Sequence, residues 1–320
     1  MRWRRLVLVF GGSIAAMAYS GNRADEIYTA GPEMLTARAT RIVAGPVSAY
    51  SKEVLSTSEP PGPNAIPLKW IASGRVDSPV QLKGPATGPV SFNREEGSVL
   101  IADTLDMPSW EQGYGDVRLS GQVVVFLSSD PEEMPLATIP SAEGELDLAS
   151  LVRDIADIQS SPADAQANRW LEYVETAPTA NGREAALRSL VQMDAEWKRM
   201  RPTLERLLAN PSLNGQVRGF AFSIVVFGLT HEKWAHDQVS VADFLGGQFE
   251  LARAPRVALQ YILSLKLAVQ YTMEEAAREA REPVRKRIID ALKRSEREQS
   301  RAPEVAEQYR QIRAAYPGLF

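Results

Sequence analysis

The period at which apolar residues recur changes once along this chain, close to Asp147. Before that point apolar and polar residues roughly alternate, which is typical of β-strands. After it, apolar residues recur every three or four positions, as in Leu148, Leu151, Val152 and Ile155, which is typical of amphipathic helices. Because the two periods occupy separate halves of the chain, the sequence predicts an α+β protein of two domains. We place a β domain at residues 33–140 and an all-helical domain at 148–320, joined by a linker at 141–147.

The N-terminal half predicts a small antiparallel β-barrel or sandwich. The run Val123–Leu127 has the composition of a strand buried on both faces, and Ser120-Gly121 before it suits a tight hairpin turn. Turn signals such as Pro60-Pro61-Gly62-Pro63 are dense, and no long helical pattern interrupts them. The expected strands are residues 34–43, 69–76, 89–92, 117–119 and 122–127.

The C-terminal half predicts a series of helices joined by short loops, so that neighbours run antiparallel. Ser161-Pro162-Ala163-Asp164 forms a capping box that opens one of them. Further helix starts are expected at four prolines, which are Pro202, Pro255, Pro283 and Pro303. A solenoid and an irregular helical bundle both fit this pattern.

Two limited resemblances accompany these patterns. Residues 75–84, with the turn Leu82-Lys83-Gly84, and residues 120–127 resemble exported bacterial domains of the oligonucleotide/oligosaccharide-binding barrel type. This resemblance implies a small barrel and transfers no catalytic residue. In the helical half, Arg183, Arg218 and Arg256 stand near the starts of comparable apolar helices, at a spacing that is similar to the period of HEAT-type repeats.

The N-terminus has the three parts of a secretory signal. Three arginines lie within the first five residues, a largely apolar run extends from Leu6 to Ala18, and Ala16-Met17-Ala18 is a small-residue cleavage site. We expect residues 1–18 to be removed, residues 19–32 to form a linker, and the product to be periplasmic or secreted in a bacterium. The apolar run is shorter than the about 20 residues of a spanning helix, so no stable membrane span is expected after cleavage.

The composition narrows the classes of partner. The formal net charge is −4, and loss of the signal arginines makes the chain more acidic. Binding to nucleic acid requires a dense basic stripe, which this composition argues against. The chain has no cysteine, so disulfides and a lipid-anchored cysteine are excluded.

The two histidines of the chain stand together in Leu229-Thr230-His231-Glu232-Lys233-Trp234-Ala235-His236. A zinc site of the H-E-x-x-H type needs a spacing of four, whereas His231 and His236 are five apart and would point about 140° apart on a regular helix. We therefore interpret the stretch as a helix start. Gly228 would end the preceding helix, Thr230 would be the N-cap, and Leu229 and Trp234 would form a hydrophobic staple.

With the histidine pair set aside, no recognisable catalytic constellation remains, and no cofactor or metal is expected. Trp110 and Tyr114 lie in a polar loop, where aromatic rings can stack on a ligand or simply cover one end of the barrel. The leading hypothesis is an exported, non-enzymatic binding or scaffold protein of the bacterial cell envelope, whose partner is another protein or envelope component. The alternatives are a metal-dependent hydrolase using His231, Glu232 and His236, and a glycan-binding envelope factor using Trp110 and Tyr114.

Overall fold

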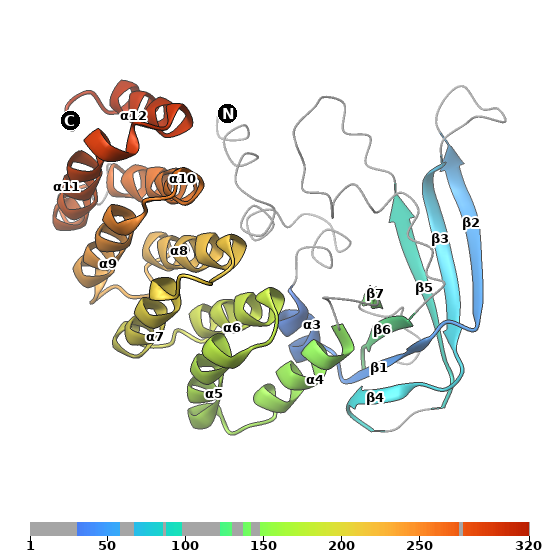
Figure 1. Cartoon of the computed structure of the whole chain (residues 1–320). Helices are drawn as coiled ribbons and strands as arrows, with labels where there is room; N and C mark the ends of the chain where they lie inside the picture. The colour runs from blue at the N-terminus through green and yellow to red at the C-terminus, as the bar shows by residue number, and fades with distance from the viewer. Residues whose placement is uncertain are drawn as a thin grey trace. The chain divides into compact units, whose positions relative to one another are not determined.

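The computed structural model describes residues 31–57, 67–85, 88–97, 122–129, 137–141, 148–274 and 278–319. It contains antiparallel strands in the N-terminal half and helices in the C-terminal half, which confirms the predicted α+β class (Figure 1). The chain divides into two compact units, the first ending at Ser161 and the second beginning at Pro162.

The first unit contains two helices and seven strands among its described residues. Its elements are α3 (Pro32–Arg38), β1 (Arg41–Pro46), β2 (Ala49–Thr57), β3 (Pro67–Val76), β4 (Val80–Lys83), β5 (Val90–Gly97), β6 (Gln122–Leu127), β7 (Ala137–Ser141) and α4 (Leu148–Gln159). The strands form a four-stranded sheet in the order β4-β1-β6-β7 and a three-stranded sheet in the order β2-β3-β5. All the pairings are antiparallel, and the described strands do not close into a barrel.

One apolar cluster joins the two sheets. Strand β6 lies inside its sheet between β1 and β7, and Val123 to Phe126 are completely buried, which confirms the prediction for this run. Val123 and Val125 belong to a core that also takes residues from the three-stranded sheet, because inward-facing side chains of antiparallel strands share one face. The members of this core are Val43, Val76, Val90, Phe92, Val123 and Val125.

The predicted strand 34–43 is wrong in its first half. Residues 32–38 form helix α3, which begins at Pro32, a residue suited to a first helical turn. The buried Leu35 and Ala39 are four apart and therefore share one helical face. The alternation that suggested a strand applies only from Arg41 onward, where β1 begins.

Helix α4 belongs to the first unit, although its sequence period is that of the helical half. Its apolar face, Leu151, Val152, Ile155 and Ile158, is buried, and the helix packs against α3. The Gln159 side-chain amide donates to the Glu33 carbonyl oxygen at 2.8 Å. The compact unit therefore extends past the expected linker at 141–147, to Ser161.

The second unit is a two-layered stack of helices (Figure 1). Helices α6, α8, α10 and α12 pack one on the next in one layer, and α5, α7, α9 and α11 do so in the other. This is the arrangement of a solenoid, in which each helix contacts its neighbours in sequence and the helix after next. The helices are α5 (Ala163–Thr176), α6 (Ala180–Gln192), α7 (Trp197–Ala209), α8 (Gly215–Thr230), α9 (Gln238–Leu251), α10 (Pro255–Thr272), α11 (Glu282–Gln299) and α12 (Pro303–Ala315).

Proline predicts three of the four helix starts correctly. Pro255 and Pro303 are first residues of α10 and α12, and Pro283 is the second residue of α11. Pro202 instead lies inside α7. The buried Trp197 and Met200 precede it, so that packing of the first turn, rather than the proline, fixes where this helix begins.

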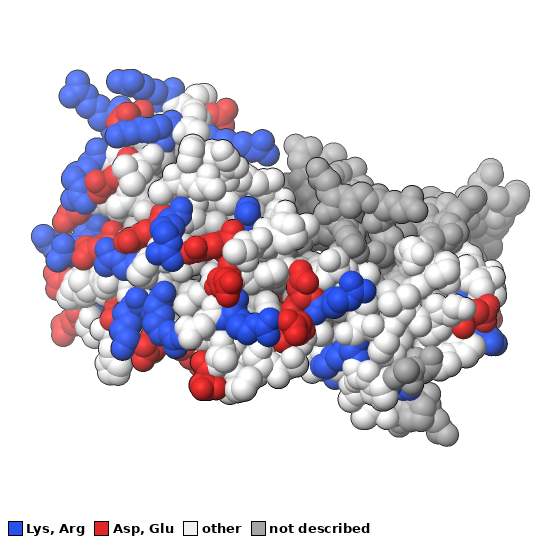
Figure 2. Space-filling model, turned by 60° about the horizontal axis from the view of Figure 1, so that its bottom comes forward, with Lys and Arg blue, Asp and Glu red and all other residues white. Residues whose placement is uncertain are grey.

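The layer formed by α5, α7, α9 and α11 carries a repeated ladder of polar contacts. On α7, Arg199 and Arg206 reach Asn168 and Glu175 of α5. On α11, Arg287 and Arg294 reach Asp243 and Glu250 of α9. In both cases the arginines are seven residues apart and so are their acceptors, which places each set on one helix face. Figure 2 shows basic and acidic side chains interspersed across this part of the molecule.

The buried residues of the first four helices also have equivalents in the last four. Ala167, Trp170 and Val174 of α5 and the equivalent Ala242, Leu245 and Phe249 of α9 are all buried. Helices α5–α8 and α9–α12 are therefore two versions of one four-helix arrangement. Further equivalent buried pairs are Met200 with Ile288, Leu204 with Leu292, Leu187 with Ile262, Leu190 with Leu265, Val217 with Val305, and Ile224 with Ile312.

Candidate interaction surface on helices α9 and α11

The turn between α8 and α9 holds the two histidines, and it ends a helix rather than starting one. Helix α8 continues through Thr230, and His231 is its C-cap. The amide of Lys233 donates to the Gly228 carbonyl at 2.9 Å and that of Glu232 to the Leu229 carbonyl at 3.2 Å. This is the Schellman motif, and Glu232 occupies its left-handed position with a φ of 56°. The predicted N-cap at Thr230 is therefore wrong.

Packing of Trp234 explains the difference. A Cβ atom at Gly228 would lie 2.3 Å from Cζ3 of Trp234, so the glycine makes room for the indole inside α8 instead of ending that helix. The Trp234 indole N–H donates to the Ala195 carbonyl oxygen at 2.9 Å, and its ring centroid is 5.2 Å from that of Trp197. The tryptophan thus packs back against the start of α7, not across a new helical turn.

The structure gives His231 and His236 separate environments. The His231 ring stacks on Phe227 with centroids 3.9 Å apart, and its Nδ1 lies 2.9 Å from the Phe227 carbonyl oxygen. His236 is exposed in the turn that precedes α9. Within the described ranges, no three histidine, aspartate or glutamate side chains come together to hold a metal ion. His231, Glu232 and His236 are not assembled as a metal centre.

Glu232 is instead bound by Arg281, a residue that sequence analysis did not single out. The Arg281 guanidinium donates to Glu232 Oε1 at 2.8 Å, to Glu274 Oε2 at 2.7 Å and to the Tyr271 carbonyl oxygen at 2.8 Å. It also lies over the Tyr271 ring, 3.6 Å from its centroid. Only 11% of the Arg281 side chain is exposed, so this cation is held by carboxylates and a ring at once.

The pKa values of Glu232 and Tyr271 in this network shift in opposite directions. Hydrogen bonds from Arg281 and then from Tyr271 lower the pKa of the Glu232 carboxyl. Burial raises the pKa of the Tyr271 hydroxyl, which donates to Glu232 Oε1 at 3.1 Å. Glu232 is therefore ionised and Tyr271 neutral near neutral pH. The cluster connects the end of α8, the end of α10 and the start of α11, and so fixes where α11 begins.

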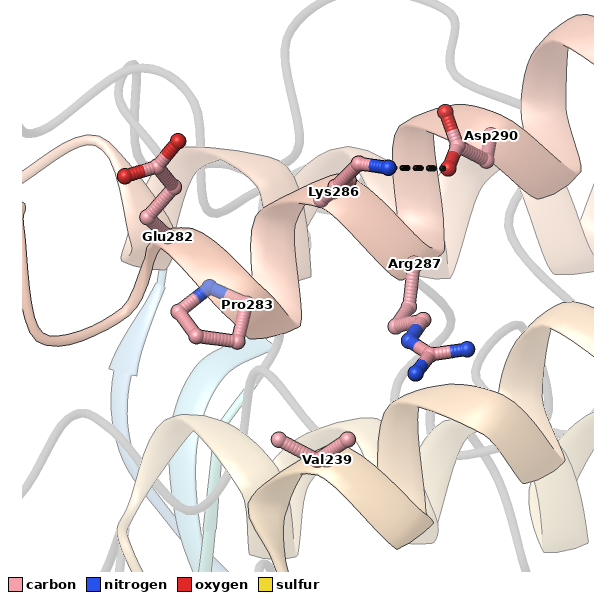
Figure 3. Close-up of a pocket in the computed structure, with 6 residues that line it drawn as sticks. All are labelled: Val239, Glu282, Pro283, Lys286, Arg287 and Asp290. Atoms are coloured by element: carbon pink, nitrogen blue, oxygen red, sulfur yellow. Dashed lines mark ion pairs between the residues drawn. The ribbon is translucent and has the colours of Figure 1, made fainter.

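A groove of about 430 Å³ lies beside this cluster, between α9 and α11 (Figure 3). Val239 projects from α9 toward α11, on the side where Pro283 lies. The rim carries both charges, and its ion pairs are Lys286 Nζ to Asp290 Oδ2 at 3.6 Å and Arg287 Nη1 to Asp243 Oδ1 at 3.3 Å. The residues that line the groove are Val239, Glu282, Pro283, Lys286, Arg287 and Asp290.

Val239 distinguishes α9 from α5, its counterpart in the first four helices. It is 38% exposed, which is unusual for a large apolar side chain in this structure. The equivalent position on α5 is Asp164, and the position equivalent to Pro283 is Ala195, whereas Lys286 and Arg287 correspond to Lys198 and Arg199. The two basic residues are thus common to α7 and α11, whereas the two apolar lining residues of the groove have Asp164 and Ala195 as their counterparts.

The sequence pointed to Glu232 as part of a possible metal site, whereas the structure places this carboxylate in a hydrogen-bonded ion pair with Arg281. Arg281 and Val239 carry no local motif, since Arg281 binds Glu232, 49 positions away, and Val239 lines the groove with residues of a different helix. Trp110 and Tyr114, proposed to bind a ligand, lie outside the described residues.

Two apolar residues, Val239 and Pro283, line the groove together with four charged ones. No family model, no curated protein sequence and no solved structure matches this chain. In the ranges that the structure describes, none of the helices has both the length and the hydrophobicity needed to cross a lipid bilayer.

Proposed function

We propose that the protein is a non-enzymatic binding or scaffold protein, and that its helical unit binds another protein at the groove between α9 and α11. The observation that carries the proposal is the exposed Val239 on the floor of a groove whose rim is charged. Because Val239 is 38% exposed, burial of the part still in contact with water stabilises a complex by about 0.5–1 kcal/mol, and a charged rim selects the partner and its orientation.

The groove is an anchor point within a larger contact. A stable protein–protein interface buries about 800 Å² on each partner, which exceeds what a groove lined by six residues supplies. The two-layered stack supplies the remaining area, because solenoids offer continuous surfaces along successive helices. A partner would therefore insert one apolar side chain beside Val239 and contact the neighbouring faces of α9 and α11.

We also propose that the protein acts in the bacterial cell envelope, because residues 1–18 have the composition of a secretory signal. Fractionation of the source cells, followed by N-terminal sequencing of the protein, tests this. Recovery outside the cytoplasm with Tyr19 as the first residue is the expected result. Recovery in the cytoplasm with an intact Met1 would contradict it.

The binding proposal is tested with matched variants of α9. Val239→Arg fills and charges the floor of the groove, whereas Leu251→Arg changes an exposed apolar residue, 68% exposed, that does not line the groove. Immobilised mature protein is incubated with envelope extract, and captured proteins are compared by quantitative mass spectrometry. We expect partners that wild type and Leu251→Arg capture equally and that Val239→Arg loses. A set of captured proteins that is the same for all three would refute the role of the groove.

A further inference from the structure

The exposed face of α11 continues from the groove into a basic stripe. Lys286 lines the groove, and Lys293, Arg297 and Arg301 follow at helical spacing and are all exposed. Arg301 lies two residues beyond the end of α11, in the turn that leads to α12. Figure 2 shows lysine and arginine side chains gathered at the end of the helical unit that contains α11 and α12.

The carboxylates on the same turns of α11 are already bound to arginines of other elements. Glu296 pairs with Arg313 of α12 at 2.6 Å, and Glu298 pairs with Arg253, which precedes α10. Within the described part of the chain, Arg297 and Arg301 form no ion pair. Arg297 and Arg301 therefore present positive charge to solvent that no described carboxylate neutralises.

This charge is local. Residues 278–319 contain eleven lysines and arginines against seven aspartates and glutamates, a formal charge of +4, in a chain whose total is −4. Basic residues near a helix C-terminus also favour the helix dipole, but α7, the counterpart of α11, has Glu205, Ala209 and Leu213 at the positions of Lys293, Arg297 and Arg301. The stripe is thus specific to the helix that also forms the groove.

We infer that the partner of the α9–α11 groove is an acidic protein segment, with one apolar residue beside Val239 and carboxylates beside Arg297 and Arg301. The inference rests on the proposed function, since it names the chemistry of the occupant of the same groove. Lys286 and Arg297 are eleven residues apart, which is about 16 Å along a helix. A helical partner segment of about 12 residues spans both parts of the surface, and arginines pair well with its carboxylates.

A synthetic probe tests the charge of this occupant. The probe is a fluorescein-labelled helical peptide of alanine and glutamate with one leucine near its end, and binding to the full mature protein is followed by fluorescence anisotropy. We expect binding that weakens as salt is raised, and about a tenfold loss of affinity for the double variant Arg297→Glu/Arg301→Glu. Lys198→Glu, on the exposed face of α7, is the control and should bind the probe as wild type does. Arg297→Gln/Arg301→Gln, which removes charge without reversing it, should show a smaller loss.

Three further results would overturn the inference. The first is equal affinity of wild type and both double variants, with circular dichroism showing that all are folded. The second is equal binding of a lysine-for-glutamate probe. The third is that the acidic peptide does not bind, whereas wild type sediments with phosphatidylglycerol vesicles and the double variants do not. This result would assign the stripe to a lipid surface.

The envelope capture experiment separates this inference from the proposed function. If Val239→Arg loses the partners and Arg297→Glu/Arg301→Glu captures all of them, the groove remains the binding site but its occupant is not acidic. Retention in both variants refutes both proposals. Loss in both variants, with retention in Lys198→Glu and Leu251→Arg, is the result expected if both hold.

Discussion

Glu232 adopts a left-handed backbone conformation, and its Oε1 accepts a hydrogen bond from Arg281 Nη2 at 2.8 Å. The two residues are 49 positions apart and join the end of α8 to the start of α11. Glycine is the residue that fits this backbone position best, because it has no Cβ. The Glu232 side chain offsets this backbone cost through its contacts with Arg281 and Tyr271, which hold the start of α11 in place.

Substitutions at Glu232 separate the backbone from the side chain. Glu232→Ala loses the hydrogen bonds to Arg281 and Tyr271 and keeps a Cβ in the left-handed region, whereas Glu232→Gly loses the same bonds and relieves the backbone. We expect both variants to be less stable than wild type in urea unfolding, with Glu232→Ala the less stable of the two. An alanine variant as stable as wild type would show that Arg281 does not need this carboxylate.

The same pair predicts how stability changes in acid. Because its pKa is lowered from 4.5 in the folded protein, Glu232 contributes stability above about pH 4.5, and this contribution is lost as pH falls through the folded-state pKa. Other carboxylates also titrate in acid, so wild type is compared with Glu232→Gln. The difference between their free energies of unfolding should be constant near neutral pH and shrink below about pH 4.5. A difference that does not change with pH contradicts the assignment.

Much of the fold follows from hydrophobic period and from proline. The buried strand Val123–Leu127, the helix from Leu148 and the starts at Pro255, Pro283 and Pro303 all depend on local signals, which the sequence contains. Helix α3 and the start of α7 were missed because tertiary packing of Leu35 and Trp197 decides them. The strand order was not predictable, since pairing of β1 with both β4 and β6 joins distant segments.

The candidate site was less accessible to sequence analysis. Helix-capping rules placed a helix start at Thr230, but the Schellman motif there depends on a left-handed glutamate, which residue preferences do not favour. The repeat of four helices was also hidden in the sequence. Equivalent positions carry different residues, such as Asn168 on α5 and Asp243 on α9, and equivalent buried residues differ in size. What identifies it is which side chains meet, such as Arg206 with Glu175 and Arg294 with Glu250.

Gly228 and Gly247 provide a matched pair for testing the packing of Trp234. Gly228→Ala would place a Cβ 2.3 Å from the indole, so we expect a loss of about 1–3 kcal/mol from overpacking. Gly247, inside α9, has open space around its Cα, and Gly247→Ala should gain about 0.5–1 kcal/mol from helix propensity. Urea unfolding followed by tryptophan fluorescence measures both. A stabilising Gly228→Ala would show that the Trp234 position is wrong.

The boundary at Ser161 predicts that the helical unit folds by itself. Helices α5–α12 pack in two continuous layers and contain their own buried cluster around Trp197, Trp234 and Phe244. A fragment of residues 162–320 should show a helical circular dichroism spectrum and one cooperative thermal transition. A fragment that begins at residue 148 should be no more stable, since α4 packs in the first unit. A disordered 162–320 fragment would contradict this division.

The most direct test of the central claim is site-specific photo-crosslinking on α9 in living cells. A photoreactive phenylalanine replaces Val239 in one strain and Leu251 in another, and crosslinked products are identified after irradiation. The groove predicts a discrete crosslink to another protein from position 239, of lower yield when Arg297→Glu/Arg301→Glu is added, and none of that mass from position 251. The same products from both positions, or none from position 239, would contradict a partner-binding groove between α9 and α11.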